Sequence, residues 1–440
     1  MSQVRVLYRP FQYDMFMLSN SKGEKPRLPL QFWIVALIAF INSVSFTIII
    51  PTLYPYAKQF GLSDFEASLL TTSYSLAQFF GTPILGQLSD RWGRRPLLVF
   101  SLLGTVASNL LAAIAGVPWL LFSARIFDGI TGGNNSIAQA VISDITTPEQ
   151  RTWAFGIYSG LFRLGFVAGP PLSYVAQLVP PIQVGRLEVS SLGMSFLISA
   201  AIALIAATMC FFFLSETQTN HQSVDQIGSQ SPSVAPTKRI AKKFNFVSLF
   251  TALARPVVGP ILLMTFLNGA TFTIFTFAFQ PFFINVLGQD AKNLAIAFVA
   301  FGILAFISQV FALEPLRKRF TLINVLVGAL VARGLLFLLM PALPNIVAFS
   351  ILLACFGLVN AFPMPLIDSI LSTRSDQAEQ GEVLGLNASY LSISNAIGPA
   401  ISGLLVTAFG YSMPFWVAGA LTMMVAGFAL TLKQPKASAN

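Results

Sequence analysis

Charged side chains that interrupt long apolar stretches are the residues of this sequence best suited to chemistry. Arg125 and Asp128 lie three residues apart in one such stretch, Arg163 lies in a second and Arg333 in a third. A charge is costly in hydrocarbon, so a charged residue within a membrane segment normally faces a partner or an aqueous cavity. Residues of these types can carry a proton, form an ion pair or bind an anionic group.

The spacing of Arg125 and Asp128 places both side chains on one face of a helix. We predict Asp128 as a proton carrier, with Arg125 or Arg163 as its counter-charge. The alternative is a static ion pair that only supports the fold. Asp368, near the end of a later apolar stretch, is the next acidic candidate, unless it simply reaches water.

A second set of residues is predicted to line a substrate cavity, because amides can hydrogen-bond a substrate and phenylalanines can form apolar walls. Most phenylalanines near residue 275 are expected to face lipid or core instead. The cavity candidates are Asn42, Asn134, Asn268, Phe272, Phe275, Asn387 and Tyr390.

The elements that must hold these residues are membrane helices. Of the 440 residues 55% are hydrophobic and 10% charged, and the mean hydropathy is +0.72, values typical of polytopic membrane proteins. Apolar stretches of spanning length predict twelve helices. They lie at about 30–55, 66–87, 96–115, 119–143, 152–178, 192–213, 257–284, 293–313, 321–340, 345–370, 382–408 and 412–431.

The fold class is therefore an all-α integral membrane protein with two halves of six helices. A polar interval rich in Ser, Gln and Pro divides the two halves. The halves also echo each other: Gly169-Pro170 follows Gly156 by 13 residues, and Gly398-Pro399 follows Gly385 by 13. The predicted segments are an N-terminal segment 1–29, a first half 30–214, a linker 215–255, a second half 256–432 and a tail 433–440.

The positions of the basic residues predict the orientation. Of the 26 Lys and Arg residues, 20 fall on the side of the two termini and 3 on the other side. Both termini are therefore expected in the cytoplasm. The net charge of +9 follows from this bias and requires no nucleic-acid partner. The first apolar stretch is expected to remain as an uncleaved anchor.

Several kinds of chemistry are disfavoured by what the sequence contains. The single histidine, His221, lies in the linker, and Cys210 and Cys355 lie far apart in separate helices. We expect no metal site, no cofactor and no enzymatic activity. Because no Walker-type nucleotide fingerprint occurs, ATP-driven transport by this chain is not expected.

The stretch Gly86–Arg95 reads Gly-Gln-Leu-Ser-Asp-Arg-Trp-Gly-Arg-Arg between two apolar stretches. Its glycines suit close helix approach and a tight turn, and its charges suit helix ends. The order resembles the cytoplasmic signature between the second and third helices of the major facilitator superfamily. The resemblance implies two halves that rock about a central site, with a gate built from Gly86, Asp90, Arg91, Gly93, Arg94 and Arg95. It also places Asp90 near the start of the eleventh helix, at about residue 382.

Further stretches resemble the proton-coupled exporters of that superfamily. Arg125 followed by Gly129 and Gly133 resembles their fourth-helix motif, whose arginine is associated with proton transfer, and Gly165-x-x-x-Gly169-Pro170 resembles their antiporter motif. The loop Asp144–Arg151 implies an ion pair between Asp144 and an arginine of the signature. The resemblance extends the gate to Asp144, Arg151, Gly165, Gly169 and Pro170, and the repeated spacing in the second half adds Gly398 and Pro399.

Together these features predict a secondary transporter that works by alternating access, exchanging protons for amphipathic organic compounds across the cytoplasmic membrane. The resemblance is closest to tetracycline/proton antiporters, but Asn42 stands where those proteins have an acidic residue, so tetracycline itself is not predicted. Its partners would be a small-molecule substrate, protons and lipid, and the chain is expected to work as a monomer. The alternatives are an uptake carrier for an organic anion, anchored by Arg163 and Arg333, and a receptor without transport.

Overall fold

A bundle of long, roughly aligned helices makes up almost the whole of the computed structural model, which describes residues 28–184, 187–217, 246–375 and 380–432. The first half contains α1 (Leu30–Thr47), α2 (Ile50–Gln59), α3 (Asp64–Trp92), α4 (Arg94–Ala113), α5 (Pro118–Thr131), α6 (Asn134–Ile145), α7 (Pro148–Leu178) and α8 (Gly193–Phe213). The second half contains α9 (Phe246–Leu253), α10 (Val258–Pro281), η2 (Phe282–Val286), α11 (Ala291–Phe311), α12 (Leu313–Arg319), α13 (Leu322–Ala342), α14 (Ile346–Asn360), α15 (Pro363–Arg374), α16 (Gln380–Phe409) and α17 (Met413–Thr431).

The helices agree closely with the ranges expected from hydropathy, but three of the expected spans are interrupted. The first is divided between α1 and α2, the fourth between α5 and α6 at Gly132–Gly133, and the tenth between α14 and α15. Proline occupies the first turn of α2 and of α15. The missing N–H group of proline is tolerated there, because backbone N–H groups of the first turn make no hydrogen bond within the helix. These divisions place backbone polar groups inside the bundle.

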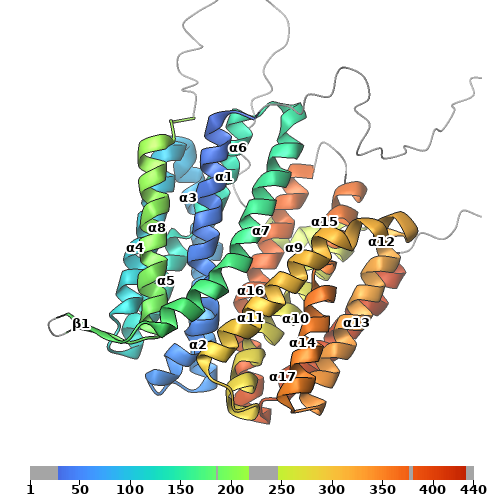
Figure 1. Ribbon diagram of the computed structural model, residues 1–440. Helices are drawn as coiled ribbons and strands as arrows, with labels where there is room; N and C mark the ends of the chain where they lie inside the picture. The colour runs from blue at the N-terminus through green and yellow to red at the C-terminus, as the bar shows by residue number, and fades with distance from the viewer. Residues whose placement is uncertain (1–27, 185–186, 218–245, 376–379, 433–440) are drawn as a thin grey trace, which may run out of the picture.

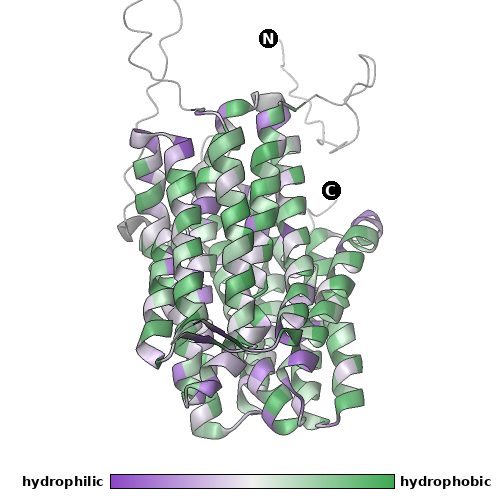
Figure 2. Ribbon diagram, turned by 60° about the vertical axis from the view of Figure 1, so that its left-hand side comes forward, coloured by the Kyte–Doolittle hydropathy of each residue, from purple (hydrophilic) through white to green (hydrophobic). Residues whose placement is uncertain are grey.

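Nine helical segments among the described residues are long and apolar enough to cross a membrane. The other three predicted spans correspond to α3, to α5 with α6, and to α7. The helices α3 and α7 have 29 and 31 residues, but Ser, Thr, Gly and Gln lower their hydropathy. Figure 2 shows apolar residues along most of the helix surfaces and polar residues gathered toward the ends. The count of twelve therefore stays a prediction.

The predicted domain boundaries also stay predictions, because the termini and much of the linker lie outside the described residues. The described end of the predicted linker forms α9. A short antiparallel hairpin of β1 (Ile182–Val184) and β2 (Leu187–Val189) connects α7 to α8 and was not expected from the sequence. Its place at one end of the bundle is visible in Figure 1.

The two halves each have their own apolar core. One cluster joins α1, α4, α6, α7 and α8, and another joins α9, α10, α13, α15, α16 and α17. Helix α3 packs along α16, and α7 packs along α11, so these four helices form the junction between the halves. In Figure 1, α7 and α11 lie next to each other where the green and yellow parts of the bundle meet.

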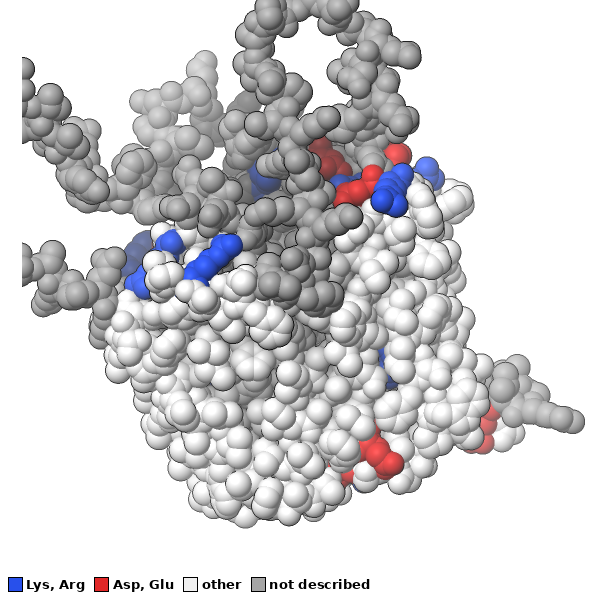
Figure 3. Space-filling view, turned by 180° about the vertical axis from the view of Figure 1, so that it is seen from behind, with Lys and Arg blue, Asp and Glu red and all other residues white. Residues whose placement is uncertain are grey.

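Charged side chains divide the bundle into two ends (Figure 3). We call one end the basic face. It carries Arg91, Arg94, Arg95, Arg151, Arg255, Arg317, Lys318, Arg319 and Arg374. The opposite end, here the far face, carries Lys58 and Lys292 together with Asp64, Glu66, Glu188 and Asp290. The described part of the chain thus keeps the unequal distribution of charge that predicts membrane orientation.

Candidate functional site

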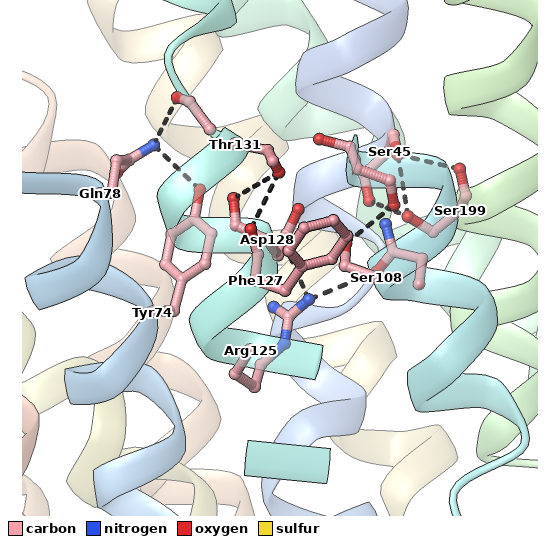
Figure 4. A network of polar contacts seen from close by, with 12 residues as sticks. Ser45, Tyr74, Gln78, Ser108, Arg125, Phe127, Asp128, Thr131 and Ser199 are labelled. Carbon is pink, nitrogen blue, oxygen red and sulfur yellow. Dashed lines mark hydrogen bonds and ion pairs between the residues drawn. The ribbon is translucent and has the colours of Figure 1, made fainter. Parts of the chain in front are cut away.

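Arg125 and Asp128 form a buried ion pair on α5. The Arg125 Nη2 atom lies 2.7 Å from Asp128 Oδ2, and the two residues are 2% and 4% exposed. Figure 4 shows both side chains enclosed by neighbouring helices, with Tyr74 of α3 close by. The expected placement of the two residues on one helical face is confirmed.

The surroundings of this pair are polar on one side and aromatic on the other. Arg125 Nη2 also donates a hydrogen bond to Asn109 Oδ1 at 3.3 Å, and its guanidinium lies over the rings of Tyr74 and Phe196. The hydroxyls of Thr105 and Ser108 on α4 lie within hydrogen-bonding reach of the Asp128 carboxylate. The pair is therefore held within the first half, between α3, α4, α5 and α8.

Two more of the predicted cavity residues meet near the break between α5 and α6. Asn134 Nδ2 donates to Asn42 Oδ1 at 2.9 Å, and Gln78 Nε2 donates at 3.1 Å to the carbonyl of Gly132 in the break. Asn135 accepts a short hydrogen bond from the Tyr158 hydroxyl. A crevice with room for about one water molecule lies there. It is lined by Ile38, Ala39, Asn42, Leu98, Leu102, Asn134, Asn135, Ala138, Tyr158 and Phe162.

Sequence reasoning missed Asn135, Tyr158 and Gln78. Asn135 directly follows Asn134, which was predicted, so adjacency was the available signal. The contacts of Gln78 and Tyr158 come from separate helices, and no local pattern could have shown them.

Arg163 does not pair with Asp128. Its side chain is exposed at the middle of α7, and its Nη1 atom donates to Gln309 Oε1 on α11 at 3.2 Å. The charged group of the second half that interacts electrostatically with Arg163 is Asp368 of α15. The prediction of Arg163 as counter-ion for Asp128 is replaced by this contact across the halves, because α5 and α7 turn their charges in different directions.

Asn387 lies at the centre of a hydrogen-bonded chain in the second half. Thr265 donates to Asn387 Oδ1 at 2.6 Å, and Asn387 Nδ2 donates to Asp368 Oδ1 at 2.9 Å. Asp368 is half-buried. Of the two interpretations made from the sequence, the one in which its side chain simply reaches water does not describe this position. Asn387 therefore positions a carboxylate at the junction of the halves.

The other cavity candidates of the second half are mostly packed inside it. Phe275 is 3% exposed and stacks on Phe337 with ring centroids 4.7 Å apart, so it belongs to the core. Phe272 packs against the same cluster. The Tyr390 hydroxyl donates to the Leu249 carbonyl and ties α16 to α9. In this conformation the three residues pack against other protein groups, and their place in a substrate cavity stays a prediction.

Asn268 and Arg333 are also buried, but their polar groups are only partly satisfied. Asn268 Oδ1 and Arg333 Nε have no hydrogen-bond partner in the part of the chain that the structure describes. Arg333 donates to Thr271 Oγ1 at 3.0 Å and to Asn360 Oδ1 at 3.5 Å, next to the break between α14 and α15. The carboxyl end of α14 supplies a partial negative charge there.

The signature stretch forms the end of α3, a turn and the start of α4. Gly93 has a φ of +102°, a conformation that glycine adopts readily. Arg94 joins Asp90 in an ion pair and donates from Nε to Asp144 Oδ2 at 3.0 Å, so the pairing of Asp144 with the signature is present. Gly86 faces open space, and no close helix approach occurs there.

The remaining gate residues of the first half cap helix ends. Glu216, which sequence reasoning missed, accepts hydrogen bonds from the backbone N–H groups of Arg94 and Arg95 at 2.9 and 3.2 Å. Arg151 donates to the Ser143 and Thr146 carbonyls at the end of α6. Arg91 is exposed. The expected neighbour of Asp90 at about residue 382 lies outside the side chains that the structure describes.

The gate glycines pack two pairs of helices backbone to backbone. A Cβ atom on Gly165 would lie 2.6 Å from Ser43 Cβ, and one on Gly169 would lie 2.8 Å from the Ile48 nitrogen. In the second half, a Cβ atom on Gly398 would lie 2.9 Å from Thr273 Cβ. Pro170 and Pro399, which follow these glycines, are buried within continuous helices.

The second half repeats this packing with the residues exchanged. Ser43 of α1 faces Gly165 of α7, whereas Gly269 of α10 faces Ser394 of α16. Each serine hydroxyl donates to the carbonyl three residues before the opposing glycine, at 2.7 Å to Phe162 and at 2.8 Å to Phe266. The internal repeat therefore includes a specific helix–helix contact.

The two halves close against each other on the far face. The Tyr54 hydroxyl donates to Asp64 Oδ1 at 2.6 Å and accepts from Asn285 Nδ2 of the second half at 3.0 Å. The Lys58 ammonium lies 3.2 Å from the same Asp64 oxygen, and Tyr411 of the second half lies near the same carboxylate. This far-face latch joins both halves through one carboxylate.

We expect Tyr54→Phe to favour opening of the far face. The variant loses the hydrogen bond that crosses the halves from Asn285 to Tyr54, worth about 0.5–1.5 kcal/mol, so the population open on this side should rise by about twofold to tenfold. Labelling rates of a cysteine introduced at Phe277, in a chain without Cys210 and Cys355, measure this opening. Tyr56→Phe is the matched control, because Tyr56 donates to Ala112 within its own half. Equal labelling in the two variants would contradict the latch.

The arrangement defines a class of protein. Two helical halves with repeated packing meet along four long helices, carry charges at their junction and are latched at one end, which is the architecture of membrane carriers that alternate between two open states. A family model described as "Major Facilitator Superfamily" matches residues 35–259 and 261–440. The chain therefore belongs to the major facilitator superfamily and is a multi-pass membrane protein.

Characterised relatives of the chain include resistance proteins. The class C tetracycline resistance protein of Escherichia coli is 29% identical over 88% of this chain and 92% of its own length. Multidrug resistance protein 2 of Bacillus subtilis strain 168 is 25% identical over 90% of this chain and 94% of its own length.

Solved structures share the fold. A bacterial homologue of the human lysosomal transporter Spinster, in an inward-facing and occupied conformation, superimposes with a TM-score of 0.73 at 15% identity and covers 93% of this chain and 97% of its own. The human organic anion transporter MFSD10 gives a TM-score of 0.66 at 19% identity, with 91% and 100% covered.

Proposed function

We propose that this protein is a proton-coupled exporter of amphipathic organic compounds. The observation that carries the proposal is the buried Arg125–Asp128 pair, which lies in a stretch that resembles the fourth-helix motif of proton-coupled exporters. Protonation of Asp128 would cancel its charge and release Arg125, so the protonated and ionised states differ in their internal contacts. Such a difference allows a proton to bias a conformational equilibrium. The names of the relatives support export as the direction.

We place the protein in the cytoplasmic membrane with both termini in the cytoplasm. The arginines of the basic face then lie on the side that the positive-inside rule requires. With this orientation the latched far face is the outer face, and we infer that the basic face is the side that opens in this conformation. The exposed Arg163 side chain at the middle of α7 fits such an opening, because a charge at this depth needs access to water.

A second candidate function is uptake of an organic anion. It is favoured by Arg333, which is 1% exposed and takes part in no ion pair within the described part of the chain. A buried guanidinium without a carboxylate could bind an anionic group of a substrate. The two candidates predict opposite directions of net transport.

The experiment is pH-gradient fluorescence in inside-out vesicles that contain the protein. A panel of lipophilic cations, neutral antibiotics and organic anions is added, and proton release coupled to uptake into the vesicles is measured. We expect at least one lipophilic cation or neutral compound to dissipate the gradient. Vesicles with folded protein that respond to no compound would contradict proton-coupled export, and a response to anions alone would favour the second candidate.

The Asp128→Asn variant tests the role of the pair in the same assay. Asparagine has a similar volume and cannot release a proton, so we expect compound-induced proton movement to disappear while the protein still folds. Retention of full coupling in Asp128→Asn would assign the proton to another group.

A further inference from the structure

Asp368 is the carboxylate of the second half that lies at the junction with the first. It is half-buried on α15, in the part of the tenth span that follows the break near Ala361. Its hydrogen-bond donor is the neutral amide of Asn387, at 2.9 Å, and Thr265 fixes that amide from the other side at 2.6 Å. Among the described side chains no cation forms an ion pair with this carboxylate, whereas Arg125 pairs with Asp128. The Asp368 carboxylate is thus fixed in orientation by Asn387, and no described cation in contact with it neutralises its charge.

Arg163 of the first half lies within electrostatic range of Asp368. The two groups attract each other electrostatically, although these two described side chains are not in ion-pair contact. The guanidinium is exposed and is held by the neutral side chain of Gln309 at 3.2 Å. Two opposite charges, each held by an amide, thus lie on opposite sides of the junction that opens and closes.

Few other charges could compete for this carboxylate. The elements packed against α15 are α10, α13 and α16. Helix α10 contains no charged residue. The charged residue of α13 is Arg333, and its guanidinium donates hydrogen bonds to Thr271 and Asn360. On α16 the titratable groups are Tyr390, whose hydroxyl donates to the Leu249 carbonyl, and Glu382, whose side chain the structure does not describe. On α15 itself Arg374 donates to the Leu432 carbonyl. Arg163 is therefore the described cation that is positioned to pair with Asp368.

We propose that Asp368 is a second proton-binding site of the carrier, and that Arg163 is the counter-charge that its ionised form contacts when the basic face closes. This inference rests on the proposed function and deepens it. When the basic face is open, Asp368 releases its proton to the water on that side, and the carboxylate then attracts Arg163 across the junction. Closure of the basic face brings the two charges together and opens the far face. A proton arriving from that side neutralises Asp368, frees Arg163 and lets the basic face reopen.

This sequence has the direction that export requires. The ionised carrier moves from the open basic face to the open far face and can take a substrate outward, and the protonated carrier returns. One proton moves inward in each cycle from this site, and no other reactant is needed. Asn387 is a positioning residue, because it touches the proton-binding carboxylate and holds its rotamer.

The first test measures conformation and needs no substrate. Spin labels at cysteines introduced at Trp92 and Phe320, exposed residues on the basic face of the two halves, report the distance between them after Cys210 and Cys355 are replaced. We expect this distance to shorten as the pH is raised in the otherwise unchanged chain. Asp368→Asn should remain open at every pH and lose at least nine-tenths of the response. Glu314→Gln, which removes an exposed carboxylate paired with Lys318, is the control and should keep the response.

The second test measures coupling in the vesicle assay with a compound that the unaltered protein exports. We expect Asp368→Asn to lose at least tenfold in coupled flux but to keep binding of the compound, and Asn387→Asp to shift the pH profile with smaller loss. Arg163→Gln should show the same open bias as Asp368→Asn, whereas Arg163→Lys should restore part of the closure.

A pH-dependent distance that is unchanged in Asp368→Asn would overturn the inference, as would full coupled flux in that variant. These results are separable from failure of the proposed function. If the unaltered protein moves no proton with any compound, export fails, and the distance measurement still decides whether Asp368 and Arg163 form the switch. If Asp368→Asn does not fold, Arg163→Gln gives the same decision, because its side chain is exposed and its loss leaves no buried charge.

Discussion

Arg125→Met is expected to abolish transport and to destabilise the folded protein by about 3–5 kcal/mol, the usual cost of removing one partner of a buried ion pair. Methionine fills a similar length but leaves the Asp128 carboxylate 4% exposed and without its cation. The Tyr74 and Phe196 rings, over which the guanidinium lies, cannot replace its charge. Thermal unfolding in detergent and compound-dependent proton flux in vesicles measure the two effects.

The double variant Arg125→Met, Asp128→Leu is the control for this result. With both charges removed no unpaired charge remains, so thermal stability should return to near that of the unaltered protein. Transport should not return, because the group that binds the proton is absent. A single Arg125→Met variant as stable as the original, with full flux, would show that the pair is neither structural nor functional.

Gly169→Leu should prevent correct packing of α7 on α1 and remove transport. Even a Cβ atom at this position would overlap the Thr47 hydroxyl and lie 2.8 Å from the Ile48 nitrogen, so the smaller change Gly169→Ala should already cost about 1–3 kcal/mol. A leucine adds three further carbon atoms to a contact between two backbones, and α7 must move away from α1. Yield of folded protein and thermal unfolding give the stability, and the vesicle assay gives the flux.

Gly156→Ala is the matched control on the same helix, because a Cβ atom at Gly156 meets open space. It should change stability by less than about 1 kcal/mol and leave transport intact. If Gly169→Ala were as stable and active as Gly156→Ala, the close approach of α1 and α7 would not persist during the transport cycle.

The spans and the buried ion pair could be predicted from the sequence because both depend on local signals. A run of about twenty apolar residues defines a membrane helix, and a spacing of three defines a shared face for Arg125 and Asp128. The turn at Gly93 followed from the same kind of information. The break at Gly132–Gly133 was not predicted, since glycine within an apolar stretch is compatible with a continuous membrane helix.

Contacts between distant parts of the chain were the part that sequence reasoning could not supply. Arg163 was a candidate counter-ion for Asp128 or for an anionic substrate group, because a charge within a membrane helix needs a partner. Its hydrogen-bond partner Gln309 and the carboxylate of Asp368, with which it interacts electrostatically, belong to the second half. Phe275 was assigned to a cavity because it shares a helix face with Asn268, but its ring stacks on Phe337 in the core. The choice between cavity and core depends on helix rotation, which a uniformly apolar helix such as α10 does not encode.

The exchanged serine and glycine at the two repeated helix contacts have a consequence for how the halves could diverge. In the first half the serine is on α1 and the glycine on α7, and in the second half the glycine is on α10 and the serine on α16. What the two contacts share is the combined side-chain volume and one hydroxyl, not a residue at a given position. The positions form a compensating pair, in which a change to serine on one helix is acceptable when its partner becomes glycine. Two copies of one ancestral helical half could therefore drift to opposite solutions and keep the same distance between these helices.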